Sequence, residues 1–291
     1  MRTACLPVLL ALPACLLLGG CATRLGPVRE FGTQAQRLAE AFEPLPSQSL
    51  EHCRQQAMDR RVYAAEAPAA RFDAASAWRE AVEVCRPLEQ AAVQLRPLAR
   101  ALDDYGRRLA ELAADGLPRS LDRDHGALAQ AWASLDDAPK ARLDAVEALA
   151  RFLSRRALAQ SQREAVLQAL SHEQAIVAIV DTLAVVAQRL HRATLRQRLD
   201  DLPSLEDAVR AGAGAPVSVR WHLRELHRQG EALKAQQALG PRLAQAVARL
   251  KSAMRELRQQ LEQGDDAAHW AEVEALAREI RALRESLARG F

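Results

Sequence analysis

The spacing of hydrophobic residues predicts helices over nearly the whole chain beyond residue 22. Leucines and other apolar residues recur at steps of three and four, which places them on one face of a helix, and the alternation typical of strands is missing. Alanine, leucine, arginine, glutamate and glutamine dominate, and these residues lose little conformational freedom in a helix. We therefore expect an all-α fold, an elongated helical bundle.

Prolines and glycines indicate where these helices end. A first helix is expected from about Glu30 to Phe42, ending before Pro44, and a second from about 49 to 63. One long helical stretch follows over about 74–114. Shorter helical segments are expected over 120–135, 139–157, 161–170 and 204–210.

The most apolar stretch of this region runs from Ala175 to Ala187. Only Asp181 and Thr182 are polar in it, and a helix that is apolar nearly all round lies at the centre of a bundle. We expect this helix to end at Pro203. Because an unpaired buried carboxylate is costly, Asp181 should lie at the rim or pair with a neighbouring arginine.

The last third of the chain shows two heptad-like helices separated by a break at Gln263–Asp266. Such helices must run antiparallel if they pack on each other, so we expect a coiled-coil-like helical hairpin. A further helix before them should break at Gly240-Pro241. The apolar seam of the hairpin is either internal or an exposed groove that receives a partner helix. Its residues are Leu243, Val247, Leu250, Met254, Leu257, Leu261, Val273, Leu276, Ile280, Leu283 and Leu287.

The charge pattern argues against nucleic acid as a partner. The chain has 40 Lys plus Arg and 37 Asp plus Glu, so the two signs nearly cancel. Arginine and acidic residues alternate along most segments, which is typical of solvated helix faces and not of a segregated basic surface.

The first 22 residues have a different pattern. Arg2 precedes an almost unbroken apolar run from Leu6 to Leu18, which is too short to remain in a membrane and is typical of an export signal. The sequence Leu18-Gly19-Gly20-Cys21 follows, and it resembles the lipobox of bacterial lipoprotein precursors. The resemblance covers residues 1–22 and implies that residues 1–20 are a signal peptide and that Cys21 receives the lipid. The alternative is an ordinary cleaved signal peptide.

The resemblance also implies a location. Two or three acyl chains fix a protein firmly to a bilayer. Ala22 stands where an Asp often retains such proteins in the inner membrane, so the resemblance implies the periplasmic leaflet of the outer membrane. We then expect four segments. They are the signal peptide (1–20), a lipidated tether (21–28), a helical bundle (29–211) and the C-terminal hairpin region (217–291).

The cysteines fit an oxidising compartment. Cys5 and Cys15 leave with the signal and Cys21 is taken by lipid, so Cys53 and Cys85 remain as an even pair. Cys-x-x-Cys spacing is missing, which favours a structural disulfide over a redox site. Such a disulfide would stabilise the fold by roughly 3–4 kcal/mol through the entropy of the unfolded chain.

The sequence lacks the motifs of common enzyme and metal sites. It contains no His-Glu-x-x-His, Gly-x-Ser-x-Gly, phosphate loop or Glu-x-x-His pair, so we expect no enzyme, cofactor or metal. Four tryptophans should fill the core, with stacking on a sugar or peptidoglycan fragment as the alternative. They are Trp78, Trp132, Trp221 and Trp270.

These patterns leave three functional hypotheses. The first is a non-enzymatic scaffold or accessory subunit that binds an envelope protein through helix faces. The second is a module that binds lipid or a cell-wall fragment, which a cavity above roughly 300 Å³ lined by the 176–186 helix would favour. The third is an immunity lipoprotein that neutralises a toxin.

Overall fold

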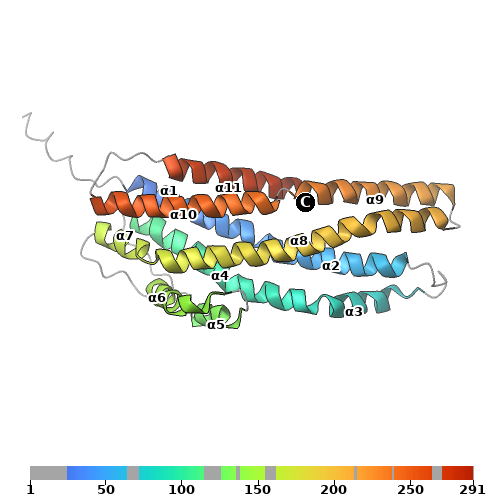
Figure 1. Cartoon of the computed structure of the whole chain (residues 1–291), viewed down its shortest axis with the longest axis horizontal. Helices are drawn as coiled ribbons and strands as arrows, with labels where there is room; N and C mark the ends of the chain where they lie inside the picture. The colour runs from blue at the N-terminus through green and yellow to red at the C-terminus, as the bar shows by residue number, and fades with distance from the viewer. Residues whose placement is uncertain are drawn as a thin grey trace, which may run out of the picture.

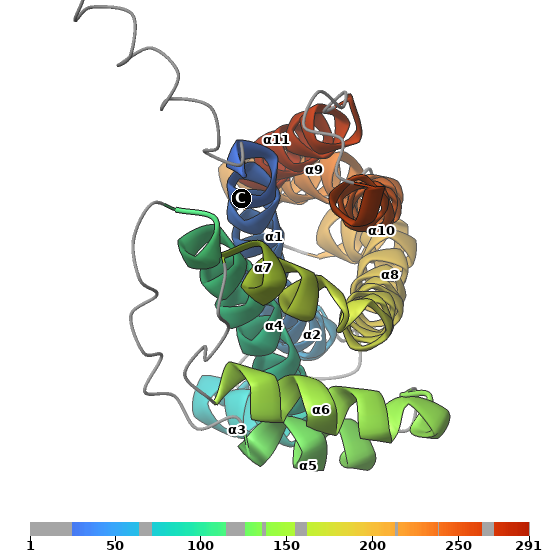
Figure 2. The ribbon, with the colours of Figure 1, turned by 90° about the vertical axis from the view of Figure 1, so that its left-hand side faces the viewer.

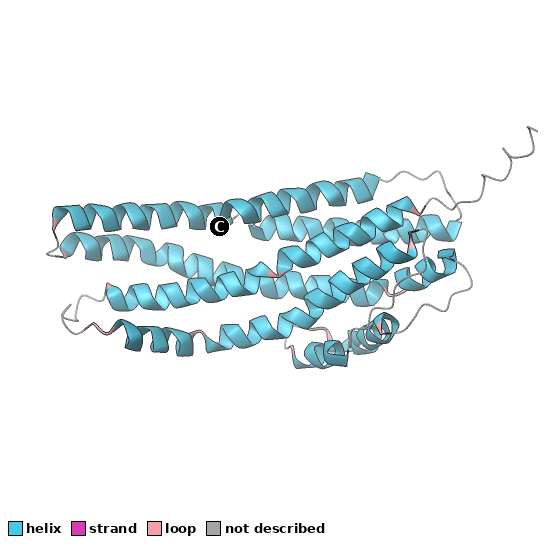
Figure 3. Ribbon diagram, turned by 180° about the vertical axis from the view of Figure 1, so that it is seen from behind, coloured by secondary structure: helices cyan, strands magenta, loops and turns pink. Residues whose placement is uncertain are grey.

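Helices account for nearly all of the chain that the computed structural model describes. The described residues are 25–63, 72–114, 126–135, 138–154, 162–212, 215–237, 239–263 and 271–290. They contain helices and no strand, which confirms the all-α class (Figure 3). The helices are α1 (Gly26–Phe42), α2 (Pro44–Val62), α3 (Ala74–Val84), α4 (Arg86–Leu112), α5 (Gly126–Ser134), the 3₁₀ turn η3 (Lys140–Arg142), α6 (Leu143–Leu153), α7 (Gln162–Leu170), α8 (Glu173–Ala211), α9 (Pro216–Gln236), α10 (Leu239–Gln263) and α11 (Ala271–Gly290).

The helices pack side by side into an elongated bundle, as expected (Figure 1). The longest helix, α8, has 39 residues. At about 1.5 Å per residue it is roughly 60 Å long. We call the end where α1 begins the proximal end, and it lies on the left of Figure 1. The distal end, on the right, is where α2 and α8 end and α3 and α9 begin.

The closest packing in the molecule joins α1 to α4 at two glycines. A Cβ added to Gly32 would lie 2.5 Å from the carbonyl oxygen of Gly106, and one added to Gly106 would lie 2.5 Å from the carbonyl oxygen of Gly32. The two helices therefore touch backbone to backbone, and only glycine fits at either position. Figure 2 shows α1 held between α4 on one side and α10 and α11 on the other.

The C-terminal hairpin forms as predicted, but its seam is not free. Helices α10 and α11 pack on each other and also on α1, and α10 packs on α8 as well. The hypothesis of an open groove for a partner helix is therefore wrong, because the chain's own helices cover it. All predicted seam residues are buried except Leu261, which is half-buried: Leu243, Val247, Leu250, Met254, Leu257, Val273, Leu276, Ile280, Leu283 and Leu287.

One apolar core joins the predicted bundle to the predicted hairpin region. Its buried residues come from α1, the first turn of α2, α4 to α8, α10 and α11, so a division between 29–211 and 217–291 does not correspond to separate cores. The tether prediction is also wrong at its far end. Helix α1 already begins at Gly26, and Leu25 and Val28 are buried.

Helix α1 ends before Pro44 as predicted, whereas the breaks predicted at Pro203 and at Gly240-Pro241 fall inside helices. Pro44 begins α2 and Pro87 lies in the first turn of α4, where the missing N–H would have no helical partner. Pro203 lies within α8, which continues to Ala211 because it packs along α2 and α9 on both sides of the proline. Gly240 and Pro241 belong to the first turn of α10, so the break comes earlier.

The predicted disulfide is present between Cys53 and Cys85, whose Cα atoms are 6.0 Å apart. Cys85 separates α3 from α4, so the predicted single helix over 74–114 is in fact two helices. The bond ties this junction to the middle of α2.

The apolar part of α8 lies in the core, as predicted. Most of the 175–187 segment is buried, and Val185 is the one member with an exposed side chain. Asp181 lies at the rim and accepts hydrogen bonds from the Lys251 ammonium at 2.9 and 3.0 Å. Its partner is therefore a lysine of α10 and not an arginine.

Replacing Gly106 by alanine should destabilise the fold by about 1–3 kcal/mol, because the new methyl group forces α1 and α4 apart. Urea unfolding followed by circular dichroism measures the change. Gly240→Ala is the matched control, since no atom lies within 4 Å of its added Cβ. It should change the free energy of unfolding by no more than about 1 kcal/mol. Equal stability of the Gly106→Ala variant and the parent protein would contradict the close crossing.

Candidate functional site

A layer of buried polar side chains separates two apolar clusters in the bundle. The main core fills the proximal part, and a smaller cluster of Leu205, Val209 and Leu226 lies at the distal end. Along α2, α8 and α9 most buried residues between these clusters are polar, and Leu195 and Leu233 are buried apolar residues among them. The buried polar residues are Ser49, Gln56, His191, Thr194, Arg198 and Gln236, and His52, Asp59 and Gln229 are half-buried beside them.

Arg198 of α8 is the centre of this layer. Its guanidinium lies 3.0 Å from Nδ1 of His52 and 3.0 Å from Oε1 of Gln229. It also lies 3.7 Å from a carboxylate oxygen of Asp59. A guanidinium only donates, so Nδ1 of His52 accepts, and Nε2 carries the proton and donates to Oε1 of Gln236 at 2.9 Å. These contacts tie three helices together.

A second set of contacts joins α2 to α8 next to this centre. Asp201 accepts a hydrogen bond from Gln56 at 2.7 Å and two from Arg60 at 3.0 and 3.3 Å. The hydrogen bonds and the arginine charge outweigh the opposing effect of burial, and they lower the pKa of Asp201. This carboxylate therefore remains charged and fixes the register between the two helices.

Burial shifts the ionisation of the layer toward neutral side chains. It lowers the pKa of His52, and the positive charge of Arg198 lowers it further. Burial also raises the pKa of Asp59, although the Gln55 hydrogen bond and Arg198 act in the opposite direction. His52 is therefore neutral at neutral pH, which agrees with its role as acceptor from Arg198.

His191 is the member of the layer with unused hydrogen-bonding capacity. It is 5% exposed, and its Nε2 donates to the carbonyl oxygen of Gln236 at 3.2 Å. Its Nδ1 is buried and has no hydrogen-bond partner among the described residues. Burial lowers the pKa of His191, so the ring is neutral and Nδ1 presents a lone pair.

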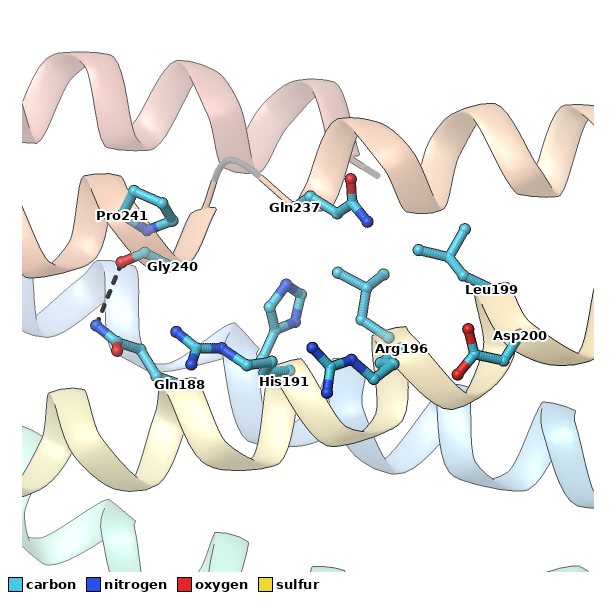
Figure 4. Close-up of a pocket in the computed structure, with 10 residues that line it drawn as sticks. Gln188, His191, Arg196, Leu199, Asp200, Gln237, Gly240 and Pro241 are labelled. Atoms are coloured by element: carbon cyan, nitrogen blue, oxygen red, sulfur yellow. Dashed lines mark hydrogen bonds between the residues drawn. The ribbon is translucent and has the colours of Figure 1, made fainter.

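An open pocket of about 400 Å³ lies beside this layer, where α9 ends and α10 begins. Figure 4 shows the His191 ring rising from α8 toward this junction. The side-chain amide of Gln188 donates to the carbonyl oxygen of Gly240 at 3.2 Å and closes one end. The pocket is lined by Gln188, His191, Arg192, Leu195, Arg196, Leu199, Asp200, Gln237, Gly240 and Pro241.

The sequence pattern did not predict this pocket, although a cavity along the same helix was one of its alternatives. The sequence-based hypothesis placed a cavity along 176–186, but that segment is packed in the core. The pocket lies further along the helix, beside residues 188–200. A signal was present in the spacing of α8. Its helical stripe continues beyond Ala187 at steps of three and four, but through His191, Thr194 and Arg198 instead of apolar residues. Polar residues at core positions mark such a site.

The tryptophans divide between the core and the surface. Trp132 is fully buried as predicted, whereas Trp78 is 44% and Trp221 is 60% exposed, so the prediction of core positions is wrong for these two. The Arg54 guanidinium lies 6.0 Å from the Trp78 ring centre. Trp270 and the lipobox residue Cys21 lie outside the described residues.

Exposed apolar side chains gather at the distal end. Of the eight large apolar residues that are exposed in the described part of the chain, five belong to the helix ends that meet there. These five are Val62, Phe72, Trp78, Val217 and Trp221. Helices α3 and α9 lie on different sides of the bundle, so we call only the α9 pair, Val217 and Trp221, the distal apolar surface. His222 joins this surface to α2, since its ring lies 5.0 Å from that of Trp221 and 6.3 Å from that of Tyr63.

Two further features bear on the class of the protein. Helix α8 is long and apolar enough to span a membrane, judged by length and composition, but 65% of its apolar window is buried against other helices. That burial is typical of a core helix. Within the described ranges, no three His, Cys, Asp or Glu side chains gather into a group that could hold a metal ion.

No family model, curated protein or solved structure matches the chain. The function is therefore inferred from the residues and their geometry.

Stability should fall as the pH is lowered below about 6.5, because burial lowers the pKa of His52, His172 and His191 from 6.5. The unfolded chain then binds more protons than the folded chain. The contribution of each histidine is complete above pH 6.5 and is lost as the pH falls through its folded pKa. Asp59, with a raised pKa, acts in the opposite sense above its ordinary value of 3.8.

Urea unfolding at about pH 7.5 and about pH 5.5 measures this dependence. The double variant His52→Gln, His191→Gln removes two of the three histidines, so its stability should change less between the two conditions. An unchanged difference would show that the polar layer does not bury neutral histidines.

Proposed function

We propose that this protein is a lipid-anchored lipoprotein of the periplasmic face of the outer membrane, and that it binds an envelope protein without catalysing a reaction. The lipid would be carried by Cys21, and the partner would bind the distal apolar surface. The seam of α10 and α11 has no part in this proposal, since it is buried. The observation that carries the proposal is the position of the exposed apolar side chains at the end opposite the start of α1.

The position of Cys21 in the chain supports a short connection to the membrane. Four peptide steps separate it from Leu25, so their Cα atoms lie at most about 14 Å apart. Leu25 is buried against the proximal part of the core. A lipid on Cys21 would therefore hold the proximal end next to the bilayer, and the distal end would point away from it.

The character of the distal apolar surface favours a protein partner. Val217 and Trp221 are four residues apart on α9, so they share a helix face, and they are 69% and 60% exposed. Single exposed apolar residues are normal on soluble proteins, whereas a group containing tryptophan is typical of binding sites. Tryptophan is also enriched among residues that dominate binding energy.

Cross-linking in intact envelopes followed by purification of the protein tests this proposal. The double variant Val217→Ala, Trp221→Ala should recover the partner at least about tenfold less efficiently, since truncating a central tryptophan commonly costs 2 kcal/mol or more, about 30-fold in affinity. The matched control is Val185→Ala, because Val185 is an exposed valine in the middle of α8. It should recover the same partner at the level of the parent protein.

Two outcomes would contradict the proposal. One is that no envelope protein is enriched by the parent protein over a Cys21→Ser variant. The other is that the same protein is recovered equally by the parent and by the double variant, which would place the contact elsewhere on the bundle.

A further inference from the structure

We propose that the pocket between α8, α9 and α10 binds a small amphiphile with one carboxylate or phosphate group, which lies on Arg192 and Arg196 while its apolar part covers Leu195 and Leu199. This site is separate from the distal apolar surface, and the inference does not depend on the proposed partner.

The two arginines of the pocket have no counterion among the residues that the structure describes. They are four residues apart on α8, so two like charges share one helix face. Neither forms an ion pair or hydrogen bond with another described residue, and Asp200, one turn further on, pairs with neither. In Figure 4 the Arg196 side chain extends toward His191 and away from Asp200.

Some surface arginines with an acidic residue at the same spacing pair with it, whereas Arg79 and Arg281 do not pair with Glu83 and Glu285. Arg210 lies 3.1 Å from Glu206, and Arg258 lies 2.8 Å from Glu262. The second of these has the same order as Arg196 and Asp200, with arginine first. The unpaired state of Arg196 therefore is not dictated by spacing or direction along the helix, and it leaves the guanidinium available to an external anion.

The His191 imidazole provides a further polar group with an unmet hydrogen bond. It lines the pocket, is 5% exposed, and has a buried Nδ1 without a partner among the described residues. A buried polar atom of this kind is rare in folded proteins. The remaining hydroxyl of a singly protonated phosphate monoester, or a separate hydroxyl group of a carboxylate ligand, can donate to it and complete its hydrogen bonding.

The start of α10 also favours an anion at this place. Gly240 and Pro241 line the pocket and lie in the first turn of this 25-residue helix. The positive end of the helix dipole therefore faces the pocket, together with the two guanidinium groups.

The apolar lining distinguishes an amphiphile from inorganic phosphate. Leu195, Leu199 and Pro241 supply apolar walls, and the volume of about 400 Å³ exceeds the needs of a free phosphate ion. The pocket lies where α10 begins, and α10 is 25 residues long and ends at the proximal end. It is therefore about 35–40 Å from that end, too far for headgroups of an anchoring bilayer to reach. The ligand is thus a free amphiphile and not a bilayer lipid.

Isothermal titration calorimetry tests the proposal with the full chain carrying Cys21→Ser, which leaves every described residue unchanged. The probes are octyl phosphate and octanoate below their critical micelle concentrations. Octan-1-ol serves as a probe of the apolar part alone, and inorganic phosphate as a probe of the anionic group alone. Both amphiphilic anions should bind one per chain. Each half alone should bind at least about tenfold more weakly, because it uses only one part of the pocket.

The double variant Arg192→Gln, Arg196→Gln should weaken binding of octyl phosphate at least about tenfold, because it removes both cationic partners. Its matched control is Arg220→Gln, Arg224→Gln, an exposed and a half-buried arginine at the same spacing on α9, and this variant should bind like the parent. Circular dichroism checks that both variants fold. The absence of binding by either amphiphile, or equal binding by the pocket variant, would overturn the proposal. The protein carrying its lipid on Cys21 and inserted in phosphatidylcholine vesicles should bind octyl phosphate equally with and without phosphatidic acid in the bilayer. Loss of octyl phosphate binding when phosphatidic acid is present would overturn the assignment to a free amphiphile, which rests on the proposed lipid anchor.

Discussion

The backbone contact between Gly32 and Gly106 is the constraint on which the arrangement of the bundle depends. It lets α1 approach α4 more closely than any side chain would permit, and α1 then fills the space between α4 and the C-terminal hairpin. The seam of α10 and α11 is buried as a result, because α1 covers part of it. The same contact fixes the first described residue, Leu25, at the proximal end, and with it the direction of the long axis relative to Cys21.

The layer of buried polar side chains determines how α2, α8 and α9 pack between the main core and the distal cluster. Burying Arg198, His52 and His191 in the bundle costs desolvation free energy. The hydrogen bond from Arg198 to His52 and the hydrogen bonds of both histidines to Gln236 offset this cost. Such a layer fixes register, since a shift of any helix would leave a charge unpaired. It also coincides with the end of α9 and the start of α10, where the chain opens into the pocket. The pocket is therefore formed by the junction between α9 and α10 together with the polar layer beside it.

Sequence periodicity was sufficient for the fold class, the hairpin, the central helix and the disulfide, because each follows from local spacing or from cysteine number. It failed where the outcome depends on distant partners. Pro203 stays inside α8 because α2 and α9 pack along it, and Trp221 is exposed because no other helix covers the start of α9. The pocket was missed for the same reason. Its arginines resemble ordinary solvated residues in the sequence, and only the structure shows that they lack acidic partners among the described residues.

The central claim is that the bundle stands on its proximal end, with the distal apolar surface directed away from the membrane. Position-dependent quenching of a fluorophore by a quencher in the bilayer tests it, with the lipidated protein labelled at Gln263→Cys near the proximal end or at Val217→Cys at the distal end. The account predicts strong quenching at position 263 and little at 217, since roughly 60 Å separates the two ends. Equal quenching at both positions, or quenching at neither, would contradict it.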